Sequence, residues 1–181
     1  MKRFITILSL LLIAAFTVSA QKTAKKTLKK SKPKTSAAKS QITKAEREKF
    51  DPLKNPAEDL QSAIVKANNE NKRIILDVGG EWCGWCRLMD NYLMKNAELG
   101  KLRNENYVWV KINMSEENEN KEFLSKYPEA TGYPHLYVLE KDGTLLKSKD
   151  TSELEQGESY DLQKFTGFLK EFAPVKNAEM K

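Results

Sequence analysis

The apolar positions of the chain follow two different spacings, and the shorter one predicts four strands. Residues 73–78 form a short run of branched apolar side chains, which indicates a buried strand. Residues 107–113 alternate between apolar and polar side chains, as in a strand with one buried face. Residues 132–140 predict a third strand that opens near a proline, and Asp142-Gly143 predicts a tight turn into a fourth strand over residues 144–147.

The longer spacing, with an apolar side chain every three or four residues, predicts helices. These helices cover residues 57–69, the chain from Cys83 onward, residues 116–127 and residues 160–172. The helix that follows Cys83 is expected to fray or restart near residues 96–102. Residues 148–159 are charged and follow neither spacing, so we expect a loop there.

The order of these elements favours an α/β fold. Helix, strand, helix, strand, helix, hairpin and helix follow one another from about residue 50. Parallel strands need a crossover helix whereas a hairpin is antiparallel, so we expect a central mixed β-sheet flanked by helices. Residues 50–181 are enough to bury a single hydrophobic core, and they show no internal repeat.

The first 20 residues predict export. Lys2 and Arg3 precede an apolar run over residues 4–16, and the small residues Val18-Ser19-Ala20 follow it. This is the organisation of a signal peptide cleaved after Ala20, which places the protein in the periplasm or outside the cell. The apolar run is short for a membrane span, so an uncleaved anchor is the less favoured alternative.

A lysine-rich segment over residues 21–49 separates the signal peptide from the predicted domain. Residues 22–49 contain eleven Lys or Arg and two Glu, a net charge of +9, whereas residues 50–181 contain 18 basic and 23 acidic side chains, a net charge of −5. The segment has little that could join a core, so we expect it to be disordered. It is interpreted as a solvated spacer or, alternatively, as a weak contact with a membrane surface. Nucleic-acid binding is not expected of an exported protein with an acidic domain.

Both cysteines of the chain, Cys83 and Cys86, lie between the first strand and the next helix. Cys83 is therefore expected at a helix N-terminus, where free backbone N–H groups and the helix dipole stabilise a thiolate. Cys86 lies one turn further along, within reach of a mixed disulfide on Cys83. A structural disulfide would close too short a loop to add much stability, and a zinc site would need more ligands than these cysteines and His135 supply. The spacing thus indicates redox chemistry with no metal.

The motif itself resembles a known family. Residues 81–86 read E-W-C-G-W-C, which is similar to the W-C-G-x-C active site of thioredoxin-fold proteins, and the resemblance extends from about Phe50 to Phe172. It implies a thioredoxin-like fold, a redox disulfide between Cys83 and Cys86, and no bound cofactor. Trp85 stands where typical thioredoxins have proline, so the direction of electron flow is not fixed by the resemblance.

Two charged residues match positions of this family. Asp77, six residues before Cys83, lies where the family has a buried acid, and Lys111 in the next strand lies where thioredoxins have a lysine near that acid. A carboxylate in an apolar strand is costly unless it is used or compensated, so Asp77 is expected to take the proton from Cys86. The alternatives are an Asp77 in solvent or paired with Lys111, and a Lys111 that is only a surface residue.

Four further residues are expected to contact the substrate. Tyr133 and Pro134 match the cis-proline loop that faces the disulfide in this family, and a cis bond there would let Tyr133 pair with an extended substrate segment. Trp82 and Trp85 flank the cysteines as apolar contact surface, although ordinary packing is the alternative for both. The single histidine, His135, receives no role.

These observations predict an exported thiol-disulfide oxidoreductase that exchanges its dithiol with protein substrates. Cys83 attacks, a mixed disulfide forms and Cys86 releases the substrate. The resemblance to exported thioredoxin-like reductases favours reduction, with oxidase and isomerase as alternatives. We expect a monomer served by a redox partner that recycles the dithiol. The rival function is a non-enzymatic binding domain that holds a partner near Pro134.

Overall fold

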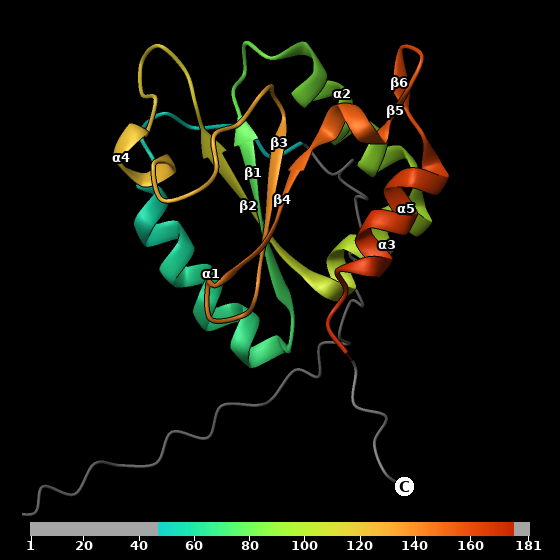
Figure 1. Cartoon of the computed structure of the whole chain (residues 1–181), viewed down its shortest axis with the longest axis horizontal. Coiled ribbons are helices and arrows are strands. Elements are labelled where there is room, and N and C mark those ends of the chain that lie inside the picture. Colours follow the sequence, from blue (N-terminus) through green and yellow to red (C-terminus); the bar gives the residue numbers. More distant parts are fainter. Residues whose placement is uncertain (1–46, 176–181) are drawn as a thin grey trace, which may run out of the picture. The chain divides into compact units, whose positions relative to one another are not determined.

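The computed structural model describes residues 47–175, and a four-stranded sheet forms their centre (Figure 1). The strands are β1 (Arg73–Gly79), β2 (Tyr107–Asn113), β3 (His135–Leu139) and β4 (Leu145–Asp150), and they lie in the order β2-β1-β3-β4. β1 runs parallel to β2 and antiparallel to β3, and β3 pairs antiparallel with β4. The predicted mixed sheet of an α/β thioredoxin-like fold is confirmed.

β1 is central because it can be buried on both faces. Its residues after Arg73 are all buried, as its unbroken apolar run predicts. The same burial encloses Asp77, which lies opposite Lys111 of β2 on one side and Leu136 of β3 on the other. The parallel register of β1 and β2 thus brings two charged residues together inside the fold.

Helices cover both faces of the sheet (Figure 1). On one face lie α1 (Pro56–Glu70) and the short α4 (Lys121–Leu124), which pack against a core that includes Ile74, Leu76, Val78 and Ile112. On the other face lie α2 (Gly84–Lys95), α3 (Ala97–Asn106) and α5 (Leu162–Glu171), around a core that includes Ile75, Leu136, Val138 and Phe165. None of the helices within residues 47–175 is both long and apolar enough to span a bilayer.

The loop predicted over residues 148–159 is wrong for most of its length. β4 continues to Asp150, a 3-10 turn η1 (Thr151–Leu154) follows, and β5 (Glu155–Gln156) pairs with β6 (Ser159–Tyr160). Leu154 and Tyr160 are buried against α5 and its neighbours. Tertiary contacts stabilise this segment. Its strands and turn are too short to produce a periodic pattern of apolar residues in the sequence.

The helix predicted over residues 116–127 shrinks to α4, because asparagine side chains bond the backbone before it. The Asn120 side chain donates to the Asn113 carbonyl at 2.7 Å, and the Asn118 side chain accepts from the Asn120 N–H at 3.1 Å. Such local bonds compete with helical hydrogen bonds. Asn120 itself adopts a left-handed conformation, with φ of 48°, directly before α4.

At the N-terminal side, the ordered fold includes three residues that were assigned to the lysine-rich segment. Residues 47–49 belong to the described chain, and Arg47 forms ion pairs with the domain. The predicted signal peptide over residues 1–20 and the rest of the lysine-rich segment, residues 21–46, lie outside the described residues.

Candidate active site

The two cysteines form a disulfide at the start of α2. Cys83 is the N-cap residue of this helix, and its Sγ accepts a hydrogen bond from the backbone N–H of Cys86 at 3.0 Å. The exposed fraction is 4% for Cys83 and zero for Cys86. A charge that develops on Cys83 would therefore meet an N–H donor and the positive end of the helix dipole. Cys83 is the better placed of the two to be a stable thiolate.

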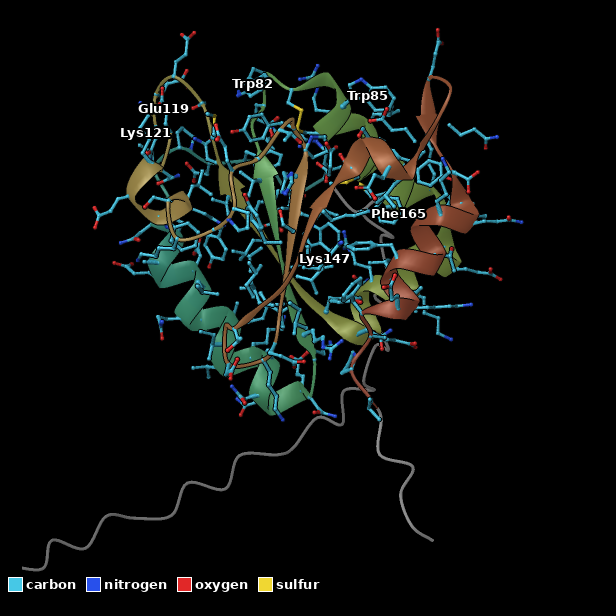
Figure 2. All side chains as sticks on the ribbon, in the orientation of Figure 1. Trp82, Trp85, Glu119, Lys121, Lys147 and Phe165 are labelled. Carbon is cyan, nitrogen blue, oxygen red and sulfur yellow. A yellow bond between two sulfur atoms is a disulfide. The ribbon has the colours of Figure 1, made fainter. Side chains whose placement is uncertain are left out.

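Aromatic side chains flank the disulfide at the end of the sheet to which the β1 arrow points (Figure 2). Trp82 is 57% exposed, its indole N–H donates to the Met114 carbonyl at 2.7 Å, and its ring meets the edge of Tyr133 at 5.8 Å. The Tyr133–Pro134 peptide bond is cis, and Tyr133 also packs against the cluster formed by Cys83, Cys86 and Phe50. These contacts place Tyr133 at the cysteine cluster, with Trp82 packed against it.

Trp85 lies on the other side of the motif and is more enclosed. Its ring meets Tyr160 of β6 edge-on at 5.6 Å, and it also packs on the cluster around Cys83 and Cys86. Trp85 therefore links the motif to the β5–β6 hairpin, which sequence reasoning treated as loop. Both alternatives for Trp85, packing and contact surface, are compatible with its half-buried position.

The two positions before the motif, Gly79 and Gly80, have no room for a larger side chain. A Cβ atom at Gly79 would lie 2.5 Å from Cys86 Sγ and 3.2 Å from the Phe50 ring. A Cβ at Gly80 would collide with the Trp82 indole nitrogen and lie 2.9 Å from the Met114 carbonyl oxygen. These two glycines thus let the cysteine helix and Trp82 approach the end of β1.

Behind the disulfide lies a buried charge network. Lys111 Nζ is 2.8 Å from Asp77 Oδ2 and 2.7 Å from Asp90 Oδ1, and the Trp109 indole N–H donates to Asp77 Oδ2 at 2.9 Å. Asp77 is fully buried, and its Oδ1 has no hydrogen-bond partner among residues 47–175. The pairing of Asp77 with Lys111, which was the alternative to a role as a base, is present, and Lys111 is a buried residue rather than a surface one.

Burial and charge act in opposite directions on this network. Burial raises the pKa of Asp90 above its usual value, and the nearby charge of Asp77 adds to this, whereas Lys111 and Arg47 oppose it. For Lys111, burial favours the neutral amine, but the two carboxylates outweigh it and raise its pKa. Lys111 is therefore held as a cation, and the carboxyl group of Asp90 is easier to protonate than an exposed one.

Asp90 was not found by sequence reasoning. It lies on α2 four residues after Cys86, so both side chains are on the same face of the helix and both are buried. A carboxylate at a core-facing position one turn after a cysteine is a signal that the sequence does contain. Its partners, however, come from β2 and from the segment before α1, which helical spacing cannot reveal.

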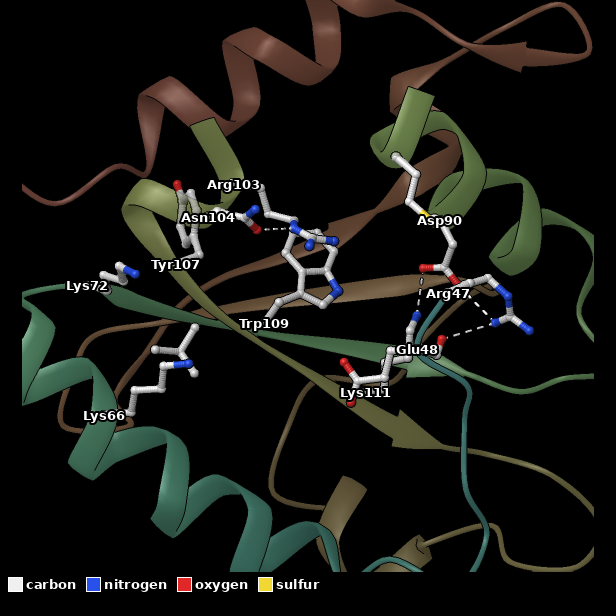
Figure 3. A pocket seen from close by; sticks show the side chains of 12 residues that line it. Arg47, Glu48, Lys66, Lys72, Asp90, Arg103, Asn104, Tyr107, Trp109 and Lys111 are labelled. Carbon is white, nitrogen blue, oxygen red and sulfur yellow. Dashed lines mark hydrogen bonds and ion pairs between the residues drawn. The ribbon is translucent and has the colours of Figure 1, made fainter. Parts of the chain in front are cut away.

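A pocket of about 430 Å³ opens onto this network (Figure 3). Arg47, Asp90, Trp109 and Lys111 contribute to its wall. Arg103 of α3 also lines it, with its guanidinium 5.5 Å from the centre of the Trp109 ring. Asp90 and Lys111, although buried, therefore contribute to the wall of a mainly basic pocket beside β2.

The model of the Thioredox_DsbH family, described as a protein family of unknown function, DUF255, matches residues 47–176. The chain belongs to this family.

The relatives with assigned names are longer proteins. Spermatogenesis-associated protein 20 of Mus musculus is 37% identical over 71 residues, which are 39% of this chain and 9% of that protein. The thiol:disulfide interchange protein DsbD of Colwellia psychrerythraea is 27% identical over 95 residues, which are 51% of this chain and 15% of that protein. The chain thus spans only a small part of the curated relatives it matches.

Among solved structures, the disulphide isomerase from Xylella fastidiosa Temecula1 has a similar fold. It superposes with a TM-score of 0.59 at 22% sequence identity, and the match covers 67% of this chain and 94% of that one. At this identity the likeness concerns the thioredoxin fold.

In this member of the Thioredox_DsbH family, the structure brings most of the expected site residues together. Tyr133 packs at the cysteines and meets Trp82, Pro134 follows Tyr133 through the cis bond, and Asp77 and Lys111 form the network behind. His135 lies apart from it: its Nε2 is 2.8 Å from the Ser148 hydroxyl, and burial lowers its pKa. Within residues 47–175, no three His, Cys, Asp or Glu side chains are grouped as ligands for a metal ion.

Proposed function

We propose that this member of the Thioredox_DsbH family is an exported thiol-disulfide oxidoreductase that reduces disulfides in protein substrates. The observation that carries the proposal is the position of the Cys83–Cys86 disulfide, at the N-terminus of α2 and in front of a buried acid–lysine network. A purely structural disulfide that closes so short a loop would add little to the stability of the protein, and it would not need ionisable groups behind it.

The reaction begins with the reduced dithiol. The Cys83 thiolate attacks one sulfur of a substrate disulfide, the substrate S–S bond breaks, and one substrate cysteine leaves as a thiolate. Cys86 then loses its proton and attacks Cys83 Sγ, which releases the second substrate cysteine and re-forms the Cys83–Cys86 disulfide. Two electrons pass to the substrate, and a dithiol redox partner then supplies two more, which reduce the Cys83–Cys86 disulfide as the partner is oxidised to its own disulfide.

The buried carboxylates serve the second step. Cys86 is fully buried, so its thiol needs a base in order to lose its proton at neutral pH. Asp77, at the heart of the network, and Asp90, one turn along the same helix, are the candidates, and Lys111 holds both. Protons reach or leave the pair through the pocket of Figure 3.

Substrates bind as extended segments beside Cys83. The exposed Trp82 ring and the Tyr133 ring provide apolar contact, and the backbone at Tyr133 pairs with the substrate chain by strand addition. Trp85 contributes from the other side of the motif. Export, with cleavage after Ala20, gives the protein access to disulfide-containing substrates.

Trapping tests this proposal. Cys86→Ser keeps the attacking thiol but removes the resolving one, so mixed disulfides with exported proteins should accumulate and should disappear on reduction. Cys83→Ser is the matched control and should trap far less, because Cys86 is fully buried. Both variants must show the same thermal unfolding. Negligible trapping by both would favour the non-enzymatic binding domain, and stronger trapping by Cys83→Ser would reverse the assigned roles.

A further inference from the structure

The segment just before the first helix crosses the back of the active site. We name residues 47–50 the N-terminal strap. Arg47 uses both terminal nitrogens on the Glu81 carboxylate, with Nη1 at 2.9 Å from Oε1, and the same Nη1 lies 3.1 Å from Asp90 Oδ2. Glu81 Oε1 also accepts a hydrogen bond from the Phe50 backbone N–H at 2.9 Å. The strap is thus fixed to the residue two positions before Cys83.

The other end of the strap packs on the disulfide itself. Phe50 is 3% exposed and forms one apolar cluster with Cys83 and Cys86. Lys111 Nζ lies 4.1 Å from the centre of the Phe50 ring, so the same ring contacts both the cysteines and the cation of the charge network. Arg47 and Phe50 therefore act together, one by charge and one by packing.

Arg47 also changes the charge balance of the network. Asp77 and Asp90 carry two negative charges and share one cation, Lys111, so this group of three has a net charge of −1 when both carboxylates are ionised. Arg47 supplies a second cation to Asp90. Without Arg47, the repulsion between the carboxylates of Asp77 and Asp90 is less well compensated, which favours protonation of one of them.

We propose that Arg47 is a positioning residue for the release step of disulfide exchange, in which it ties the redox motif to α2 and holds Asp90 as a carboxylate that can accept a proton. This inference rests on the proposed function for its effect on turnover, but not for its effect on Asp90. A neutral Asp90 could accept no proton from Cys86, so the part that Asp90 takes in the release step depends on Arg47.

Other charged or titratable groups also face Asp90, and they must be kept intact in the test. They are Lys111 of β2, Asp77 of β1, Arg103 of α3 and Tyr160 of β6. Arg47 differs from the last two because it forms a direct ion pair with Asp90, and it differs from Lys111 because it also binds Glu81.

The experiment compares Arg47→Ala, Arg47→Lys and Arg73→Ala in the full chain. Arg73 is a matched control, since its ion pair with Glu140 has a similar exposure, 19% and 36% for the two side chains against 16% and 39% for Arg47 and Glu81. The first readout is the pKa of Asp90, measured by carboxyl NMR in the oxidised protein, where no exchange occurs. Arg47→Ala should raise this pKa by about one unit, Arg47→Lys should raise it less, and Arg73→Ala should leave it unchanged.

The second readout is the rate of the release step against pH, measured by stopped flow. In Arg47→Ala, the midpoint of the profile should move by about one unit to higher pH, with the wild-type rate restored at alkaline pH. In an Asp90→Asn background, Arg47→Ala should move the midpoint no further. A uniform loss of rate at all pH values, or an unchanged Asp90 pKa, would overturn the inference and leave Arg47 with a structural role.

The two readouts separate this inference from the proposed function. A shifted Asp90 pKa in a protein that exchanges no disulfides would refute the oxidoreductase, and with it the role of Arg47 in release. Normal exchange with an unshifted Asp90 pKa would refute the role of Arg47 alone.

Discussion

Asp77 of β1 and Asp90 of α2 are bound by one ammonium group, with Lys111 Nζ at 2.8 Å from the first and 2.7 Å from the second. Burial raises the pKa of Asp90 above its usual value, although Lys111 and Arg47 both oppose this. The same arrangement links the strand that leads into the redox motif to the helix that follows it. The group formed by Asp77, Lys111 and Asp90 therefore holds β1 and α2 together and contains a carboxyl group that can accept a proton.

Removal of the shared cation should destabilise the fold strongly. Lys111→Met leaves Asp77 and Asp90 buried without it, and we expect a loss of about 3–5 kcal/mol in the free energy of unfolding at neutral pH. The variant should recover stability in acid. The folded-state pKa of Asp90 is already raised and will rise further, so the folded protein binds more protons than the unfolded chain, and stability falls as pH increases.

Urea unfolding of Lys111→Met at pH 5 and at pH 8 measures this effect. Lys72→Met is the control, because Lys72 forms its ion pair with Glu70 near the surface, and it should change stability by less than about 1 kcal/mol at both pH values. An equal loss at the two pH values in Lys111→Met would show that Asp90 does not change its protonation state.

A methyl group at Gly79 should disturb the site directly. Gly79→Ala places a Cβ 2.5 Å from Cys86 Sγ, in a core with no room for it, and should cost about 1–3 kcal/mol. Gly167→Ala in α5 is the control, because nothing lies within 4 Å of its Cβ position and alanine favours a helix. Thermal unfolding of both variants gives the comparison. Equal stability of the two would mean that the end of β1 can move away from Cys86.

Replacement of Asp77 should slow release more than attack. Asp77→Asn removes a carboxylate that is proposed to serve Cys86, so the release rate should fall by about 100-fold at neutral pH while the attack by Cys83 changes little. At alkaline pH the Cys86 thiol ionises without help, and the difference should shrink. Stopped-flow measurement of both steps checks this, and an unchanged release rate across neutral pH would leave Asp77 as a structural residue.

The lysine-rich segment should be dispensable for the chemistry. Deletion of residues 22–44 removes charged residues that are not expected to join the core, and it spares the N-terminal strap, so disulfide exchange should persist. A deletion that continues through Phe50 is the contrast, and it should impair the site because Phe50 packs on both cysteines. Loss of most activity in the shorter deletion, with the fold intact, would show that the segment positions substrate.

Local sequence patterns were sufficient for much of the fold. The predicted strand over residues 73–78, the helix that begins at Cys83 and the Asp142-Gly143 turn are all present, with boundaries within a residue or so. Each depends on side chains that are close together in the chain: a run of branched residues, a helical spacing, or a glycine free to adopt φ of 92°. The position of Cys83 at a helix N-terminus followed from the same signals.

The sequence could propose Asp77 and Lys111 as partners only through the family resemblance, because alternation in a strand gives the face of a residue and not its neighbour. The parallel register of β1 and β2 decides that they meet. The contacts of Asp90 were beyond such reasoning. In the sequence Asp90 lies 21 residues from Lys111 and 43 residues from Arg47, and only the packing of the sheet and helices brings these residues together.

The positions of the reactive sulfurs and the start of a helix beside them could be predicted from the sequence, because thiol spacing and helix initiation are local. The tertiary structure decided what surrounds those sulfurs: a glycine that leaves room for Cys86, a buried cation shared by two carboxylates, and an arginine from before the first helix that completes the network. Burial and charge compensation depend on distances across the fold, and these are set only when β1, β2, α2 and the N-terminal strap pack together.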